Sequence, residues 1–187
     1  MRIRNFGSGN EPKPGQKIVY YSASCDLLHP GVIDSMRRAK EQGDFLYVGV
    51  WDDEMVRHYR GQCYPLISLQ ERVLMVLACR FVDEVVVSAP YLVTKDLITS
   101  LNIDEVIHVE SREDAILPEF RHLDPYEEVK EAGKYKYVKR EPEDFDLTLE
   151  DIAERVLVQK ASFMKKYEKK KSSQDAYYDT KKHVKEV

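Results

Sequence analysis

Hydrophobic and polar positions follow one another along most of the chain in blocks that predict strands alternating with helices. Four apolar runs are short and rich in β-branched and aromatic residues, as buried strands of a parallel sheet are: residues 18–24, 44–51, 82–90 and 103–109. The segments that join them are longer and mix charged with apolar residues at helical spacing. The pattern therefore predicts an α/β domain.

The joining segments carry specific helix signals. After the first run, an apolar stripe follows Val32, Ile33, Met36 and Ala39. Ser68 and Glu71 have the spacing of a capping box, and Thr94 is placed to cap a further helix. Strands alternating with helices imply right-handed crossovers, so we expect a Rossmann-like, three-layer αβα domain with a parallel sheet and a ligand site at the carboxyl ends of its strands.

The last third of the chain departs from this pattern. Residues 110–144 form a long irregular insert with a short helical patch at 125–132 and a candidate strand at 134–139. An insert of this length is often functional. A final helix is expected to follow Thr148 as its cap. We expect residues 1–16 to be a linker, 17–167 the folded domain and 168–187 a charged, disordered tail.

Composition narrows the class of protein. The 187 residues are 43% hydrophobic, enough for one domain with a sizeable core. The net charge of −4 lacks the basic field that nucleic-acid binding requires, so no nucleic-acid partner is expected. No apolar run approaches the roughly 20 residues of a transmembrane helix, and the first residues lack an apolar signal core. Three cysteines without a CxxC pair predict reduced thiols, no metal site and a cytoplasmic location.

The candidate chemistry begins where the first strand meets its helix, in "YSASCDLLHPGVIDSMRRAK". His29 and Gly31 stand two apart at the helix mouth, where backbone amides and the helix dipole favour phosphate groups. Read in isolation, the pattern favours a core or capping role for His29 over a catalytic one, because HxG is a short pattern.

Three motifs resemble the cytidylyltransferase family that makes CDP-ethanolamine and CDP-choline, within the HxGH nucleotidyltransferase superfamily. They are "DLLHPG", "HYRGQCYPLISLQER" and "VLACRFVDEVVVSAPYLVT", in the family's order and spacing. The resemblance implies the nucleotidyltransferase fold and a role in phospholipid synthesis, in which a phosphate oxygen of phosphoethanolamine attacks the α-phosphate of CTP and pyrophosphate leaves. It implies no tightly bound cofactor, with Mg²⁺ present only as the counter-ion of CTP.

The segment "FGSGNEPKPGQKIVY" also resembles the one that precedes the second domain in members with two tandem cytidylyltransferase domains. This likeness implies an N-terminal cytidylyltransferase domain as partner. Homodimerisation and a freestanding domain remain open alternatives, as does the choice between choline and ethanolamine headgroups.

The chain departs from the family at several phosphate-handling places. Val32 stands where the family has its second HxGH histidine, and Arg60 stands where it has a phosphate-binding lysine. The closing RTxGxSTT signature reads "REPEDFDLTLEDI", which keeps one hydroxyl at Thr148 and adds acidic residues that repel a triphosphate, among them Glu143, Asp144 and Asp146. We therefore expect this domain to be catalytically degenerate and structural. An active enzyme and a non-catalytic nucleotide sensor are the alternatives.

The resemblance implies His29 and Arg60 as catalytic residues, the former in a degenerate site. Further residues are candidates for nucleotide or substrate binding: Asp26, Gly31, Trp51, Arg80, His108 and Thr148. Plain structural roles compete for some of them, because Asp26 can accept backbone amides in its turn and Arg80 can cap a helix. We predict that His29, Arg60, Arg80 and His108 converge on one pocket at the carboxyl ends of the strands.

Overall fold

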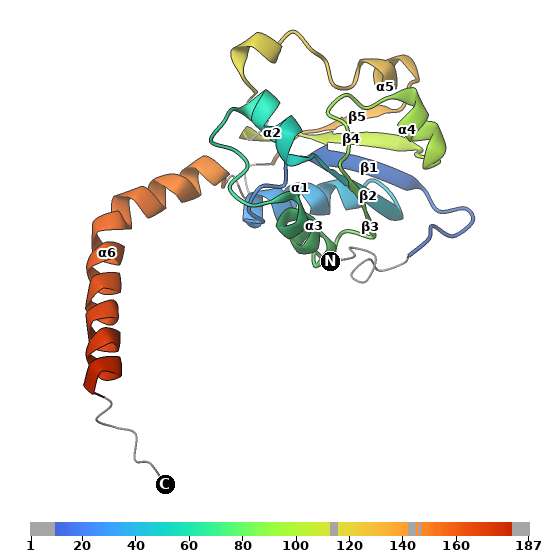
Figure 1. Ribbon diagram of the computed structural model, residues 1–187. Coiled ribbons are helices and arrows are strands. Elements are labelled where there is room, and N and C mark those ends of the chain that lie inside the picture. Colours follow the sequence, from blue (N-terminus) through green and yellow to red (C-terminus); the bar gives the residue numbers. More distant parts are fainter. Residues whose placement is uncertain (1–9, 113–115, 142–144, 146, 181–187) are drawn as a thin grey trace. The chain divides into compact units, whose positions relative to one another are not determined.

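A five-stranded parallel sheet forms the centre of the fold in a computed structural model that describes residues 10–112, 116–141, 145 and 147–180. The strands lie in the order β3-β2-β1-β4-β5, and every neighbouring pair is parallel. Their bounds are β1 Ile18–Ala23, β2 Phe45–Val50, β3 Glu84–Val87, β4 Glu105–Val109 and β5 Tyr135–Val138 (Figure 1). The predicted α/β fold with a parallel sheet is confirmed, and the candidate strand at 134–139 is its fifth member.

Helices connect the strands, and their ends match the sequence signals. They are α1 Pro30–Lys40, α2 Asp53–Arg60, α3 Leu69–Leu77, α4 Lys95–Ser100 and α5 Glu127–Glu131. The capping box of Ser68 and Glu71 opens α3, and the Thr94 side chain accepts a hydrogen bond from the Leu97 amide at the start of α4. Both predicted caps are therefore confirmed.

Helix α2 was not predicted. Its buried positions are limited to Val56, Tyr59 and Arg60, so its apolar periodicity is too short to detect in the sequence. The helix begins at a local signal instead, because the Asp52 carboxylate accepts a 2.7 Å hydrogen bond from the Met55 amide.

The sheet is covered on both faces because alternate side chains of β1 point in opposite directions. Val19 and Tyr21 belong to one buried cluster with α1 and α3, whereas Ile18 and Tyr20 belong to a second cluster with α4 and α5. Val129 of α5 is completely buried in that second cluster. Helix α5 therefore anchors the end of the long insert to the sheet.

Carboxylates fix the amino ends of the strands. Asp44 accepts a hydrogen bond from the Lys17 amide (2.8 Å), and Asp104 accepts one from the Ile18 amide (2.7 Å). Asp83 accepts from the Leu46 amide (2.7 Å) and pairs with Lys40. These contacts hold the register of the strands at the edge opposite to the expected ligand site.

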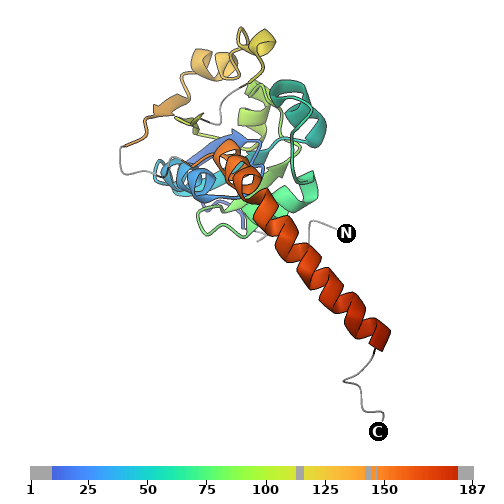
Figure 2. The same ribbon diagram turned by 90° about the vertical axis from the view of Figure 1, so that its left-hand side faces the viewer.

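The chain divides into two compact units, Met1–Leu149 and Glu150–Val187. The second contains most of α6, a continuous helix of 32 residues from Leu149 to Thr180 (Figure 2). Residues 168–180 belong to this helix, and Lys, Glu and Ala in the segment favour a helical conformation. The domain bounds given from the sequence stay predictions. Among the described residues, no helix is both long and apolar enough to cross a membrane.

Candidate functional site

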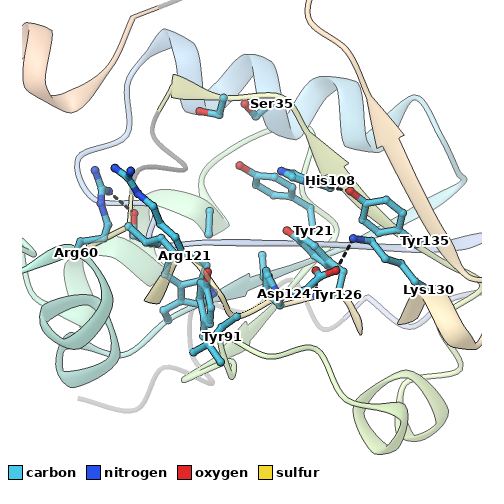
Figure 3. A pocket seen from close by; sticks show the side chains of 18 of the residues that line it. Tyr21, Ser35, Arg60, Tyr91, His108, Arg121, Asp124, Tyr126, Lys130 and Tyr135 are labelled. Atoms are coloured by element: carbon cyan, nitrogen blue, oxygen red, sulfur yellow. Dashed lines mark hydrogen bonds and ion pairs between the residues drawn. The ribbon is translucent and has the colours of Figure 1, made fainter. Parts of the chain in front are cut away.

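A cavity of about 380 Å³ opens at the carboxyl ends of the central strands (Figure 3). Its floor comes from the end of β1 and from Trp51, which follows β2, together with His108 at the end of β4. The insert and α5 supply the opposite wall, with Ile116, Arg121, His122, Leu123, Asp124, Pro125, Tyr126 and Lys130. The cavity thus lies where a parallel α/β sheet binds its ligands.

The amino-terminal end of α1, residues 29–32, forms the mouth of this helix and contributes apolar surface to the cavity. Val32 lines it and is 5% exposed, so the fourth place of the HPGV sequence presents methyl groups rather than a cation. His29 is 3% exposed, serves as the N-cap residue of α1 and is not among the described residues that line the cavity. A Cβ atom at Gly31 would clash with the Leu147 carbonyl oxygen, so packing of the chain itself requires this glycine.

Arg60 is the last residue of α2 and lines the cavity although it is 7% exposed. Its guanidinium donates a 2.8 Å hydrogen bond to the Ser24 hydroxyl, and it lies 4.6 Å from the centre of the Tyr64 ring. The hydrogen bond and the cation–π contact fix the position of this arginine.

Arg72 of α3 supports the loop between β1 and α1, which contains Ser24. It is completely buried, and it donates hydrogen bonds to the Ser24 carbonyl oxygen and to the Asp53 carboxylate. Cys25 adopts a φ of +51° and Leu27 a φ of +61°, in the left-handed region that favours glycine. The loop between β1 and α1 is therefore held in a strained shape by contacts from α2 and α3.

His108 lines the opposite part of the cavity. Its Nδ1 lies 2.8 Å from the Tyr135 hydroxyl, and its ring stacks on Tyr126 with 4.9 Å between the centres. Across the cavity, Trp51 and Tyr91 meet edge to face at 5.2 Å, and the indole Nε1 has no hydrogen-bond partner among the described residues. The walls are thus aromatic on two sides, which suits a flat organic group.

The insert adds charge that sequence reasoning did not find. Asp124 accepts a 2.6 Å hydrogen bond from Lys130. Partial burial would raise the pKa of the Asp124 carboxyl, but Lys130 and the Tyr126 amide hold that pKa below its ordinary value. Arg121 lines the cavity as well. No motif or periodic pattern marks these residues, although the length of the insert and its basic residues were a general signal.

The structure brings together Arg60, His108 and Trp51 among the predicted site residues. Arg80, by contrast, does not line the cavity. It precedes β3 in the chain and therefore lies at the amino end of that strand. There it is exposed, and its guanidinium carbon lies 4.7 Å from the centre of the Phe81 ring. His29 likewise does not line the cavity. The prediction that His29, Arg60, Arg80 and His108 converge on one pocket therefore holds for Arg60 and His108 only.

Two further predicted residues, Asp26 and Thr148, are buried. Asp26 is completely buried and accepts hydrogen bonds from the amides of Leu66 (2.7 Å) and Ile67 (3.2 Å), which supports the structural alternative for this carboxylate. Thr148 is buried and immediately precedes α6. The acidic residues Glu143, Asp144 and Asp146 lie outside the described residues. No group of three or more metal-binding side chains occurs in the part of the chain that the structure describes.

A parallel sheet with helices on both faces and a cavity at the carboxyl ends of its strands defines a Rossmann-like α/β domain. The family model described as cytidylyltransferase-like matches residues 20–174, and the chain belongs to that family. A crystal structure of the lipopolysaccharide core biosynthesis protein from Thermoplasma volcanium GSS1 shares the fold, with a TM-score of 0.52 and 19% identity over 71% of this chain and 100% of that one.

Curated relatives named ethanolamine-phosphate cytidylyltransferase match nearly the whole chain. The protein of Dictyostelium discoideum is 39% identical over 92% of this chain and 47% of its own length. Those of Arabidopsis thaliana and Mus musculus are 36% and 34% identical over 98% and 97% of this chain, and over 42% and 44% of their own lengths. The chain therefore spans less than half the length of these relatives.

Proposed function

We propose that the chain is the C-terminal cytidylyltransferase-like domain of a two-domain CTP:phosphoethanolamine cytidylyltransferase, and that this half is catalytically degenerate and structural. The names of the curated relatives support the activity of the whole enzyme, and the share of their length that the chain matches supports a partner domain. The proposed substrates of the whole enzyme are phosphoethanolamine and CTP, with Mg²⁺ as the counter-ion of CTP. No tightly bound cofactor is part of the proposal.

The observation that carries the proposed degeneracy is the apolar surface of Val32 at the mouth of α1. Transfer of a nucleotidyl group builds negative charge on the phosphoryl oxygens, which positioned cations and amides must stabilise. The Val32 side chain supplies no cation and no hydrogen-bond donor, and it lines the cavity as buried apolar surface. Arg60 retains a charge nearby, but its guanidinium already donates to Ser24. Arginine in place of the family's lysine keeps the charge but alters the geometry of the phosphate contact, which is a weak basis for turnover.

The proposed partner is an N-terminal cytidylyltransferase domain with an intact HxGH sequence, against which this domain packs; a homodimer is the alternative arrangement. The cytoplasm is the proposed location. The sequence has three cysteines and no CxxC pair, which supports a reducing compartment.

A second candidate function is a non-catalytic nucleotide sensor. The open cavity of about 380 Å³ favours this alternative, because a purely structural domain has no need to keep one. Activity toward CTP and phosphocholine or phosphoethanolamine is the remaining alternative, and it is the one that the apolar surface of Val32 disfavours.

Release of pyrophosphate tests the proposed function. The 187-residue chain is supplied with CTP, Mg²⁺ and either phosphoethanolamine or phosphocholine, alongside a family domain that has an intact HxGH sequence. We expect pyrophosphate only from the intact domain. Turnover by the 187-residue chain at a comparable rate would contradict degeneracy. A preference between the two phosphorylated alcohols would then identify the headgroup.

A further inference from the structure

The insert docks on the helix that carries Arg60. The Leu117 amide donates a 2.8 Å hydrogen bond to the Tyr59 carbonyl oxygen of α2. Phe120, at the end of a 3₁₀ turn spanning Pro118–Phe120, packs against the Tyr59 ring at 5.0 Å and the His58 ring at 4.5 Å between centres. Arg121 follows this turn directly. The contacts of the insert with α2 therefore hold Arg121 near the helix that ends in Arg60.

Two guanidinium groups share one end of the cavity. Arg60 and Arg121 both line it, and in Figure 3 both side chains reach toward the same end. The Arg121 guanidinium makes no hydrogen bond or ion pair with any residue that the structure describes. Two positive charges at one end of a cavity favour the binding of an anion there.

The opposite end of the cavity has a different charge. Lys130 pairs with Asp124 there, and Asp124 is the only carboxylate among the described residues that line the cavity. The excess of positive charge is therefore concentrated at the end formed by the two arginines. Trp51 and Tyr91 provide apolar wall beside it.

We propose that Arg60 and Arg121 form a clamp for the phosphoryl group of a small phosphate ester, with Arg121 supplied by the insert. The planar fork of arginine binds phosphate oxygens through two parallel hydrogen bonds, which gives both geometry and strength. Two guanidinium groups match the charge of a phosphomonoester. The aromatic walls accept its organic part, either a pyrimidine nucleoside or a short amino alcohol. The clamp binds its ligand whether or not the domain catalyses a reaction.

Calorimetric titration of the 187-residue chain with paired ligands tests the phosphate contact. Cytidine 5′-monophosphate is compared with cytidine, and phosphoethanolamine with ethanolamine. We expect at least one phosphate ester to bind at least tenfold more tightly than its phosphate-free counterpart, and the pair that shows this difference identifies the organic part. Equal affinity within both pairs, or no binding of either phosphate ester, would overturn the proposal.

Arg121→Gln tests the role of the insert. Arg121 is exposed, so its replacement leaves the core intact. Loss of a charge-assisted contact is expected to weaken phosphate-ester binding by about tenfold to a hundredfold, and Arg121→Lys to recover part of the loss. Arg57→Gln is the matched control, because Arg57 is an exposed arginine of α2 that does not line the cavity. Equal affinities for the Arg121→Gln and Arg57→Gln variants would exclude the clamp.

Different measurements would contradict the clamp and the proposed function. Turnover of CTP by the wild-type chain would contradict catalytic degeneracy and leave the ligand titrations unaffected. Absence of phosphate-ester binding would overturn the clamp and leave a structural, inactive domain in place.

Discussion

The mouth of α1 and the insert wall of the same cavity are built from different kinds of side chain. At the mouth, Val32 and His29 are buried, and the Leu147 carbonyl oxygen fills the space over Gly31. On the insert wall, Arg121 is exposed to the cavity and Lys130 pairs with Asp124. The first region is filled by side chains and backbone of the domain itself, whereas the second presents charged side chains to the cavity.

Under the two proposals above, this difference separates ligand binding from catalysis within one domain. Chemistry at a phosphorus atom needs cations fixed where charge develops, and the mouth of α1 is where the family resemblance places them. Binding needs only complementary charge and shape around the ligand, and the proposed clamp assigns these to the insert wall and Arg60. Changes at the mouth should therefore act on stability, and changes in the insert wall should act on ligand affinity.

The largest expected effect on stability comes from Arg72, which supports the loop before α1. Arg72→Met keeps most of the volume but leaves the Ser24 carbonyl oxygen and the Asp53 carboxylate without this donor. Because the side chain is completely buried, we expect a loss of about 3 kcal/mol in the free energy of unfolding, measured by urea denaturation. Arg57→Met is the exposed control and should change that free energy by less than about 0.5 kcal/mol. Similar values for the two variants would contradict the support role of Arg72.

A smaller loss is expected for Gly31→Ala. Alanine favours a helix over glycine by about 1 kcal/mol, so an unconstrained position would gain stability. Here the added methyl group meets the Leu147 carbonyl oxygen, and we expect a net loss of about 1 to 2 kcal/mol in the free energy of unfolding. Thermal denaturation measures the sign directly. A variant more stable than wild type would show that the mouth of α1 has room that the structure does not give it.

The smallest effect is expected from Asp124→Asn in the insert wall. The pKa of Asp124 is lower in the folded chain than its ordinary value, so its stabilising contribution is present above that ordinary value and is lost as the pH falls through the folded pKa. The pair with Lys130 is solvent-exposed, which limits the contribution to a few tenths of a kcal/mol. The difference in unfolding free energy between wild type and Asp124→Asn should therefore disappear in acid. A difference that persists unchanged at low pH would point to a cause other than this ion pair.

The sheet was predictable because its strands and caps are local signals. The run at 44–51 and the capping box at Ser68 each depend on residues close together in the sequence, and both were confirmed. Helix α2 was missed because it is held by contacts with other elements: Tyr59 stacks on Tyr91 with 4.0 Å between the ring centres, and its carbonyl oxygen accepts a hydrogen bond from the Leu117 amide.

The site was predictable only where a residue follows a strand or belongs to a family motif. His108 ends β4 and Arg60 stands in the motif "HYRG", and both line the cavity. Arg80 was misplaced because a residue before a parallel strand lies at the opposite edge of the sheet from one after it. Arg121 was missed because its position depends on the docking of the insert on α2, which no local pattern encodes.

The central claim is that phosphate chemistry has been lost at more than one place, and Val32→His tests it most directly. Pyrophosphate release from CTP and phosphoethanolamine is measured for wild type, for Val32→His, and for a variant that also carries Arg60→Lys and a rebuilt RTxGxSTT segment, with thermal denaturation confirming that each is folded. Cooperating groups in a phosphoryl-transfer site are non-additive, so restoring one recovers little while others are missing. We predict no turnover by Val32→His. Turnover by this single variant near that of an intact family domain would contradict the account.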